Sequence, residues 1–240
     1  MSGERSDDIG AGDVDPPYLW SDYRSTLLRA PLRPPVRIPV GPTEESGPDG
    51  AGLASSRAGA GPGLAFAADL TRQHAGEPLG ERIVVEGRVV DAGGRPLPGV
   101  LVEIWQANAA GRYAHDGDQH AAPLDPSFTG AGLCLTDGEG RYRFVSIKPG
   151  AYPWRNHANA WRPAHIHFSV LGRAFSQRLI TQMYFPGDPL LSYDPIFHAV
   201  PAFARERLVA GFDLERTVPE WALGYRFDIV LGGREATPAA

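Results

Sequence analysis

The feature that most constrains the fold is a series of short apolar runs that begins near residue 81, each ended by turn-forming residues. The 29 glycines and 23 prolines of the chain punctuate these runs, as in an all-β protein with many turns. We therefore predict an all-β fold, a β-sandwich with one or two short helices. The expected strands are residues 82–90, 99–105, 133–136, 141–147, 165–171, 179–185 and 225–231.

Turn signals predict how these strands connect. The AGG turn at 92–94 separates the first two runs, and the DGEG turn at 137–140 separates the third and fourth. Each pair is therefore expected to form a hairpin. A helix is expected at 201–210, because Pro201 suits the first helical position and Gly211 suits the end.

The chain divides into three parts. Residues 1–16 are polar, acidic and Gly-rich, and we expect a disordered tail. Residues 17–80 are expected to form an extended arm and loop that pack on the core or on a partner subunit, since aromatic residues there stand among too many prolines for a long helix. Residues 81–235 are the expected β-sandwich domain, which carries the candidate catalytic residues.

Charge and cysteine content exclude several classes of function. The net charge is −5 without a Lys/Arg cluster, which argues against nucleic acid or an anionic membrane as a partner. The single cysteine, Cys134, excludes a disulfide within the chain and a Cys-rich metal site. Neither a signal peptide nor an apolar run of about 18 residues is visible, so we expect a cytoplasmic protein.

The stretch 165–171 carries the most informative motif. Side chains alternate between the two faces of a strand, so Ile166 and Phe168 are expected to face the core while His165 and His167 share the other face. Two imidazoles placed in this way can reach one cation. Taken alone, an H-x-H motif is more often a polar, solvated strand face.

A metal site needs further ligands, and nearby carboxylates are sparse. A cupin-type site places a glutamate just downstream, where Leu171 and Gly172 stand. Two loops upstream of the histidines instead offer Tyr113 and Tyr152, although a loop tyrosine usually packs with its hydroxyl hydrogen-bonded. Two phenolates and two neutral imidazoles would leave a ferric ion with one formal positive charge, which one hydroxide cancels in a buried pocket.

Several long motifs, all in one order, resemble those of the intradiol ring-cleaving dioxygenases. The resemblance runs from about residue 22 to residue 231, and its length makes it far more specific than H-x-H alone. The motifs are DYRS (22–25), LVEIWQAN (101–108), GRY (111–113), APLDP (122–126), YPWRN (152–156), WRPAHIHF (161–168), LITQMYF (179–185) and YRFDIVL (225–231).

The resemblance implies a mononuclear non-heme Fe(III) held by Tyr113, Tyr152, His165 and His167. Tyr152 and His167 would be axial, and Tyr113 and His165 equatorial beside a hydroxide. Tyr152 would also act as a base toward the substrate.

Further residues match the family's active site. Arg162 would stabilise charge that develops on the substrate, and Gln182 would support it as a polar neighbour. The implied catalytic residues are thus Tyr152, Arg162 and Gln182. The implied substrate-binding residues are Tyr23, Trp154, Arg162, Gln182 and Ile196.

The motifs are most similar to those of the iron-bearing subunit in two-subunit members of the family. This similarity implies that O2 cleaves protocatechuate between its hydroxylated carbons to give 3-carboxy-cis,cis-muconate. It also implies an iron-free alpha subunit in an αβ hetero-oligomer.

Two alternatives stay open. A homodimeric relative acting on catechol or hydroxyquinol would carry a helical N-terminal region, which the prolines within 17–42 disfavour. A transthyretin-like binding module without catalysis would have no reason to place two tyrosines with the H-x-H pair.

Overall fold

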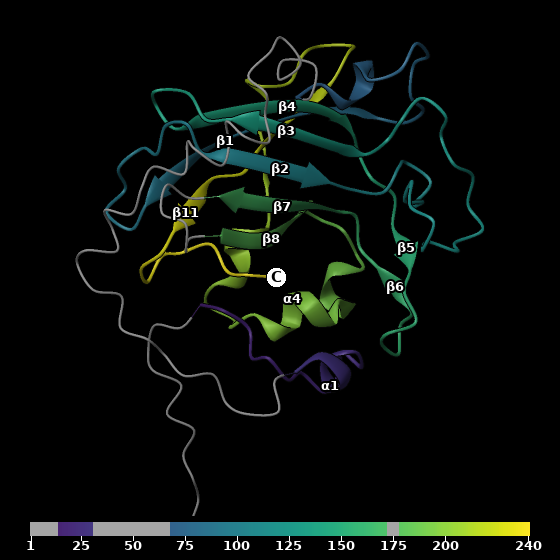
Figure 1. Ribbon diagram of the computed structural model, residues 1–240, viewed down its shortest axis with the longest axis vertical. Coiled ribbons are helices and arrows are strands. Elements are labelled where there is room, and N and C mark those ends of the chain that lie inside the picture. Colours follow the sequence, from purple (N-terminus) through teal and green to yellow (C-terminus); the bar gives the residue numbers. More distant parts are fainter. Residues whose placement is uncertain (1–13, 31–67, 172–177) are drawn as a thin grey trace, which may run out of the picture.

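The computed structural model describes residues 14–30, 68–171 and 178–240. Within these residues two β-sheets lie face to face, with short helices at one end (Figure 1). The all-β prediction is confirmed. Most of the expected tail (1–13), and the greater part of the expected arm and loop (31–67), lie outside the described residues.

The first sheet is built around its longest strand, β1 (Arg82–Asp91). β4 (Arg141–Ile147) pairs antiparallel with one edge of β1. The other edge is shared by two parallel strands, β10 (Leu223–Arg226) and β11 (Ile229–Leu231), and β9 (Gly211–Phe212) pairs with β10. The edge of β1 is therefore covered along most of its length.

The run 225–231, expected as one strand, is two strands because the ladder breaks at Phe227. A Cβ at position 87 would lie 1.7 Å from the carbonyl oxygen of Phe227, so only a glycine lets the chain pass there. The hydroxyl of Tyr142 donates to the same carbonyl at 2.5 Å.

The second sheet is antiparallel throughout and carries the candidate histidines. Its order is β3 (Ala131–Leu135), β2 (Leu101–Trp105), β7 (His165–Leu171) and β8 (Arg178–Tyr184). Two short strands, β5 (Tyr152–Pro153) and β6 (Trp161–Arg162), pair with each other beside it.

Both predicted hairpins are wrong, because β1 and β2 belong to different sheets, as do β3 and β4. The turns themselves form: Asp91 accepts bonds from the amides of Gly93 and Arg95, and Asp137 accepts them from Glu139 and Arg141. Each turn lies where the chain crosses from one sheet to the other. Local turn chemistry thus does not decide which strands pair.

The core between the sheets draws on both of them. Large side chains with at most 2% exposure come from the first sheet and from the second. Members of this one cluster include Ile83, Val85, Phe144, Ile104, Ile166, Phe168 and Met183. Burying several such side chains, at roughly 1.5–3 kcal/mol each, is what holds the two layers together.

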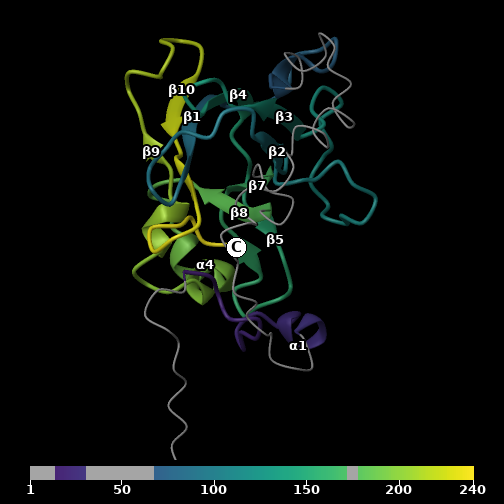
Figure 2. The same ribbon diagram turned by 60° about the vertical axis from the view of Figure 1, so that its left-hand side comes forward.

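The helices are short, and most of them gather beyond β8, with α4 beside that strand and α1 at the same end of the molecule (Figure 2). These are α1 (Thr26–Arg29), η3 (Leu191–Tyr193), α4 (Pro195–Ala199) and η4 (Arg205–Leu208). A further 3₁₀ turn, η2 (Leu70–Arg72), lies at the other end of the molecule and packs against β4.

The predicted helix at 201–210 is wrong, since only the 3₁₀ turn η4 forms there. The N-terminal proline signal belongs to Pro195, which follows the capping Asp194 in α4. Pro201 instead ends that helix, because the residue before a proline is held extended, as Val200 is at φ −69° and ψ 136°.

Candidate metal centre

Strand β7 presents its two histidines as the alternation predicts. Ile166 and Phe168 are fully buried in the core, and the rings of His165 and His167 lie on the opposite face with centroids 4.8 Å apart. This face is not solvated, since His165 is only 2% exposed. A sheltered pair of imidazoles on one face is suited to binding a cation.

Both histidines are neutral, so each ring has one nitrogen with a lone pair. Nδ1 of His165 lies 2.8 Å from the carbonyl oxygen of Pro163, which can only accept, so Nδ1 carries the proton and Nε2 does not. Burial and then the charge of Arg162 hold the pKa of His165 well below its usual range. The same two causes lower the pKa of His167 to about 3.

Trp105 fixes the plane of the second histidine. It is the last residue of β2, directly opposite His167 in the ladder, and the two rings stack with centroids 4.8 Å apart and planes within 1°. Sequence reasoning placed Trp105 in a motif but gave it no role. Knowing that β2 pairs with β7 would have revealed it.

The two tyrosines come from loops that touch backbone to backbone. Gly111 precedes Tyr113 by two residues, and Gly150 stands in the same position before Tyr152. A Cβ at Gly111, whose φ is +75°, would lie 2.1 Å from the carbonyl oxygen of Ala151. A Cβ at Gly150 would lie 2.4 Å from the carbonyl oxygen of Ala109. Glycine at both positions lets the loops approach closely enough to bring the tyrosines together.

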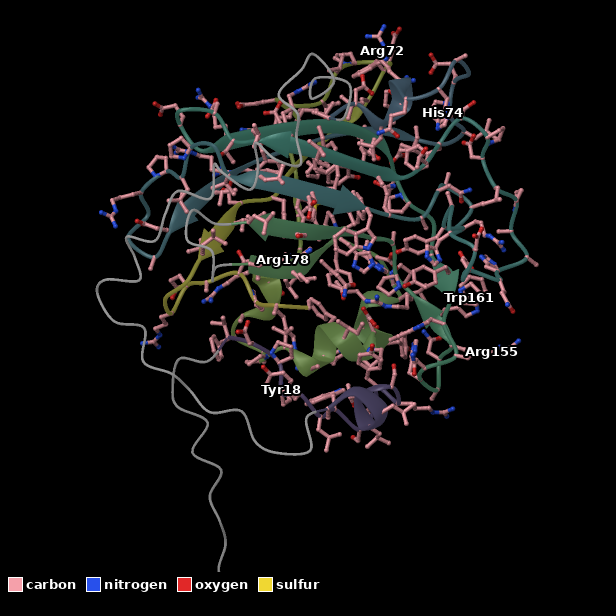
Figure 3. All side chains as sticks on the ribbon, viewed as in Figure 1. Tyr18, Arg72, His74, Arg155, Trp161 and Arg178 are labelled. Carbon is pink, nitrogen blue, oxygen red and sulfur yellow. The ribbon has the colours of Figure 1, made fainter. Side chains whose placement is uncertain are left out.

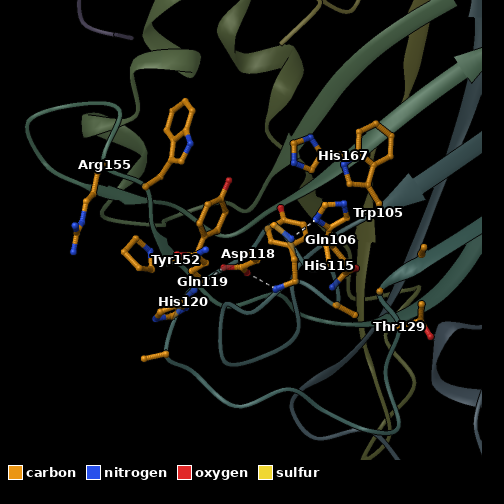
Figure 4. A pocket seen from close by; sticks show the side chains of 18 residues that line it. Trp105, Gln106, His115, Asp118, Gln119, His120, Thr129, Tyr152, Arg155 and His167 are labelled. Atoms are coloured by element: carbon orange, nitrogen blue, oxygen red, sulfur yellow. Dashed lines mark hydrogen bonds between the residues drawn. The ribbon is translucent and has the colours of Figure 1, made fainter. Parts of the chain in front are cut away.

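The four predicted ligands form a closed ring of neighbours. Beside the histidine pair, the ring centroids of Tyr113 and Tyr152 are 5.4 Å apart. The ring centroid of Tyr152 lies 5.5 Å from that of His165, and the ring centroid of Tyr113 lies 6.4 Å from that of His167. Figure 4 shows Tyr152 and His167 across the cavity from each other.

The hydroxyl of Tyr113 is an unusual feature of this ring, because it is buried and finds no partner in hydrogen-bond geometry among the residues that the structure describes. Burial and then the neighbouring Tyr152 raise the pKa of Tyr113 well above its usual value. The phenol therefore stays neutral unless a cation lies beside it. A buried, unsatisfied oxygen of this kind marks a place where a positively charged ligand fits.

The donor set fits ferric iron better than it fits zinc or ferrous iron. Among residues 14–30, 68–171 and 178–240, no three His, Cys, Asp or Glu side chains gather as a metal site, so a zinc centre or a facial triad has no support there. The available donors are two neutral imidazoles and two phenols, whose anions are hard oxygen ligands suited to a trivalent ion.

Arg162 is the largest fully buried side chain and lies directly behind His165. Its Nη1 is 3.2 Å from Nε2 of His165, and its guanidinium carbon lies 5.3 Å from the ring centroid of Trp154. Nη2 donates to Oε1 of Gln182 at 2.7 Å. Arg162 is therefore not one of the arginines that form a weak ion pair at the surface.

Two partners of Arg162 were missed from the sequence. Asp194 makes a two-point ion pair with it, with Nε–Oδ1 at 3.2 Å and Nη2–Oδ2 at 2.6 Å. The hydroxyl of Tyr184 accepts from Nη2 at 3.0 Å and donates to Asp194 at 2.8 Å. The sequence signal for Asp194 was its place before Pro195, which marks a helix start.

Two cavities open onto this centre. The smaller has a volume of about 410 Å³ and is lined by the predicted substrate residues Tyr23, Trp154, Arg162, Gln182 and Ile196, with Tyr152 and His167. The larger, about 1020 Å³, is lined by Tyr113, Tyr152 and His167 among others, and Arg155 lies at one side of it (Figure 4). Of the predicted site residues, His165 alone lines neither.

The N-terminal arm forms one wall of the smaller cavity. The ring centroid of Tyr23 lies 4.9 Å from that of Trp154. The amides of Arg24 and Ser25 donate to the backbone and side-chain oxygens of Asn156, each at 3.0 Å. Arg155 and Trp161 lie at the right-hand edge of the molecule in Figure 3.

Comparison with protein families decides the wider assignment. Residues 60–233 match the family model described as "Dioxygenase". Residues 12–40 match the model for the N-terminal part of the protocatechuate 3,4-dioxygenase beta subunit. The chain belongs to the intradiol dioxygenase family.

Curated and solved intradiol dioxygenases support this membership. The chain is 58% identical to the protocatechuate 3,4-dioxygenase beta chain of Burkholderia cepacia, covering 93% of this chain and 92% of that one. It is 30% identical to the alpha chain from the same organism, covering 66% of this chain and 76% of that one. The solved catechol 1,2-dioxygenase of Acinetobacter sp. ADP1 superimposes with a TM-score of 0.51 at 29% identity, covering 70% and 58% of the two chains.

No helix among the described residues of this intradiol dioxygenase is both long and apolar enough to cross a membrane.

Proposed function

We propose that this dioxygenase cleaves protocatechuate with O2 between its two hydroxylated carbons, giving 3-carboxy-cis,cis-muconate. The observation that carries the proposal is the buried, unpartnered hydroxyl of Tyr113 within a ring formed by Tyr152, His165 and His167. The 58% identity to a protocatechuate 3,4-dioxygenase beta chain supports the choice of substrate. The reaction balances without a further reactant, because both oxygen atoms enter the product.

Tyr113, Tyr152, His165 and His167 would hold one ferric ion. The two histidines offer lone pairs, and the two phenols would ionise beside the metal. A ferric ion bound there would supply a Lewis acid that favours ionised catechol oxygens and withdraws electron density from the ring.

The surrounding residues would prepare the substrate. Tyr152 lines both cavities, so its oxygen can take a proton from a catechol hydroxyl in the smaller one. Nη1 of Arg162 points toward the centre, where a guanidinium stabilises negative charge on the ring oxygens. Trp154 and Ile196 would hold the flat ring between apolar walls and exclude water.

We propose an iron-free alpha chain as the partner of this protein in an αβ hetero-oligomer. The beta chain that this protein resembles has an alpha counterpart in Burkholderia cepacia, and this support is the reason for proposing an alpha partner here. The smaller cavity is walled partly by Pro16 and by the arm residues Pro17 and Tyr23, so a partner packed on the arm would complete it.

Co-expression with an alpha-chain homologue tests the proposal. We expect one iron per chain, O2 uptake with protocatechuate at a 1:1 ratio, and the carboxymuconate as the sole product. Preference for catechol or hydroxyquinol would support the activity named for the 32–36% identical relatives. Protein that binds no iron would instead support the non-catalytic binding module.

A further inference from the structure

Asp194 is a completely buried carboxylate whose hydrogen bonds are all accounted for. Oδ2 accepts from Nη2 of Arg162 at 2.6 Å and from the hydroxyl of Tyr184 at 2.8 Å. Oδ1 accepts from Nε of Arg162 at 3.2 Å and from the amide of Ile196 at 3.4 Å. A carboxylate at 0% exposure is costly unless it is paired in this way, so its position points to a defined task.

The ion pair determines where the guanidinium points. The group is planar and rigid, so fixing Nε and Nη2 on Asp194 also fixes the direction of Nη1. Gln182 and Tyr184 accept further bonds from Nη2. Nη1 is left facing His165 and the metal-site residues.

The same carboxylate also holds a second residue that lines the smaller cavity. Asp194 is the N-cap of α4, and the amide that it holds belongs to Ile196, which lines the smaller cavity. One side chain therefore connects the position of the charge-stabilising arginine with that of an apolar wall.

We propose that Asp194 is a positioning residue: it aims Nη1 of Arg162 at the reacting ring of the substrate and holds Ile196 against that ring. The proposal rests on the proposed function, since it assigns Asp194 a part in intradiol cleavage. Asp194 lines neither cavity and acts through Arg162 and through Ile196.

The test compares Asp194→Asn with Asp213→Asn in the co-expressed, iron-loaded protein. Asp213 is a matched control, because it also pairs with an arginine (Arg216) and accepts from the amide two residues on, yet lies away from the site. We expect Asp194→Asn to lower kcat about 10- to 100-fold while iron content and visible spectrum stay unchanged. Asp213→Asn should keep the kcat of the parent protein.

A double-mutant cycle separates positioning from a structural role. In an Arg162→Met background, Asp194→Asn should lose most of its effect on kcat, because the arginine that it positions is gone and only its bond to the amide of Ile196 remains. An undiminished loss in that background would overturn the proposal, as would a wild-type kcat for Asp194→Asn alone.

If Asp194→Asn does not fold, Asp194→Glu keeps the charge and displaces the guanidinium by one methylene. It should lower kcat with iron retained, and a wild-type kcat would again refute the inference. Parent protein that holds no iron or consumes no O2 with protocatechuate would refute the proposed function itself, and the inference with it. Activity in the parent combined with an unaffected Asp194→Asn would refute the inference alone.

Discussion

Replacing Tyr113 with Phe should change stability in opposite directions with and without iron. The hydroxyl is buried and has no hydrogen-bond partner within the described part of the chain, and an unsatisfied buried polar group costs about 1–3 kcal/mol. In metal-free protein, Tyr113→Phe should therefore raise the free energy of unfolding by about that amount. For a domain of this size, each kcal/mol shifts the melting temperature by about 2–4 °C, so we expect a rise of about 2–12 °C.

With iron present the sign should reverse. A metal stabilises the folded state in proportion to its affinity, and Tyr113→Phe removes one of two proposed anionic ligands. Thermal unfolding monitored by circular dichroism, on chelated and on iron-loaded samples, measures both effects. Metal-bound Tyr113→Phe should melt below the iron-loaded parent and retain less iron.

Tyr142→Phe is the matched control for this experiment. Its hydroxyl is also buried but donates to the carbonyl of Phe227, so its loss should destabilise the protein by about 1 kcal/mol whether iron is present or absent. If Tyr113→Phe behaved like Tyr142→Phe in both states, the hydroxyl of Tyr113 would have no metal-binding role.

Further predictions concern the second tyrosine, the loop contact and the buried thiol. Tyr152→Phe should keep iron bound yet slow the deprotonation that accompanies substrate binding, seen by stopped-flow absorbance; unchanged turnover would count against its role as base. Gly111→Ala should reduce iron content, since the added methyl would meet the Ala151 carbonyl and push the loops apart, whereas Gly94→Ala, with open space around it, should retain the metal. Burial raises the pKa of the Cys134 thiol to about 12, so above pH 9 the unfolded chain releases a proton that the folded chain keeps. The free energy of unfolding should therefore fall by about 1.4 kcal/mol per pH unit between pH 9 and 12 from this group, and urea melts of Cys134→Ala should lack that slope.

The sequence predicted most where the signal was local. The alternation in β7 correctly put Ile166 and Phe168 in the core and both histidines on the other face. The β-sandwich was also predicted correctly, because short runs between turns require paired sheets. The pairing of those strands could not be read in the same way, since the turns after Asp91 and Asp137 form without closing a hairpin.

What the sequence missed depends on contacts between distant elements. Asp194 and Tyr184 meet Arg162 only because α4 packs beside β8, and nothing near Arg162 in the sequence indicates either partner. Trp105 stacks on His167 through the register of β2 with β7. Asp194 alone had a local signal, as the residue before a helix-starting proline.

The visible absorption spectrum of the purified, iron-loaded protein tests the central claim most directly. If Tyr113 and Tyr152 bind the ferric ion as phenolates, a sample with one iron per chain should be red-brown from phenolate-to-iron charge transfer. A colourless sample with the same iron content would contradict tyrosinate ligation, and with it the proposed centre.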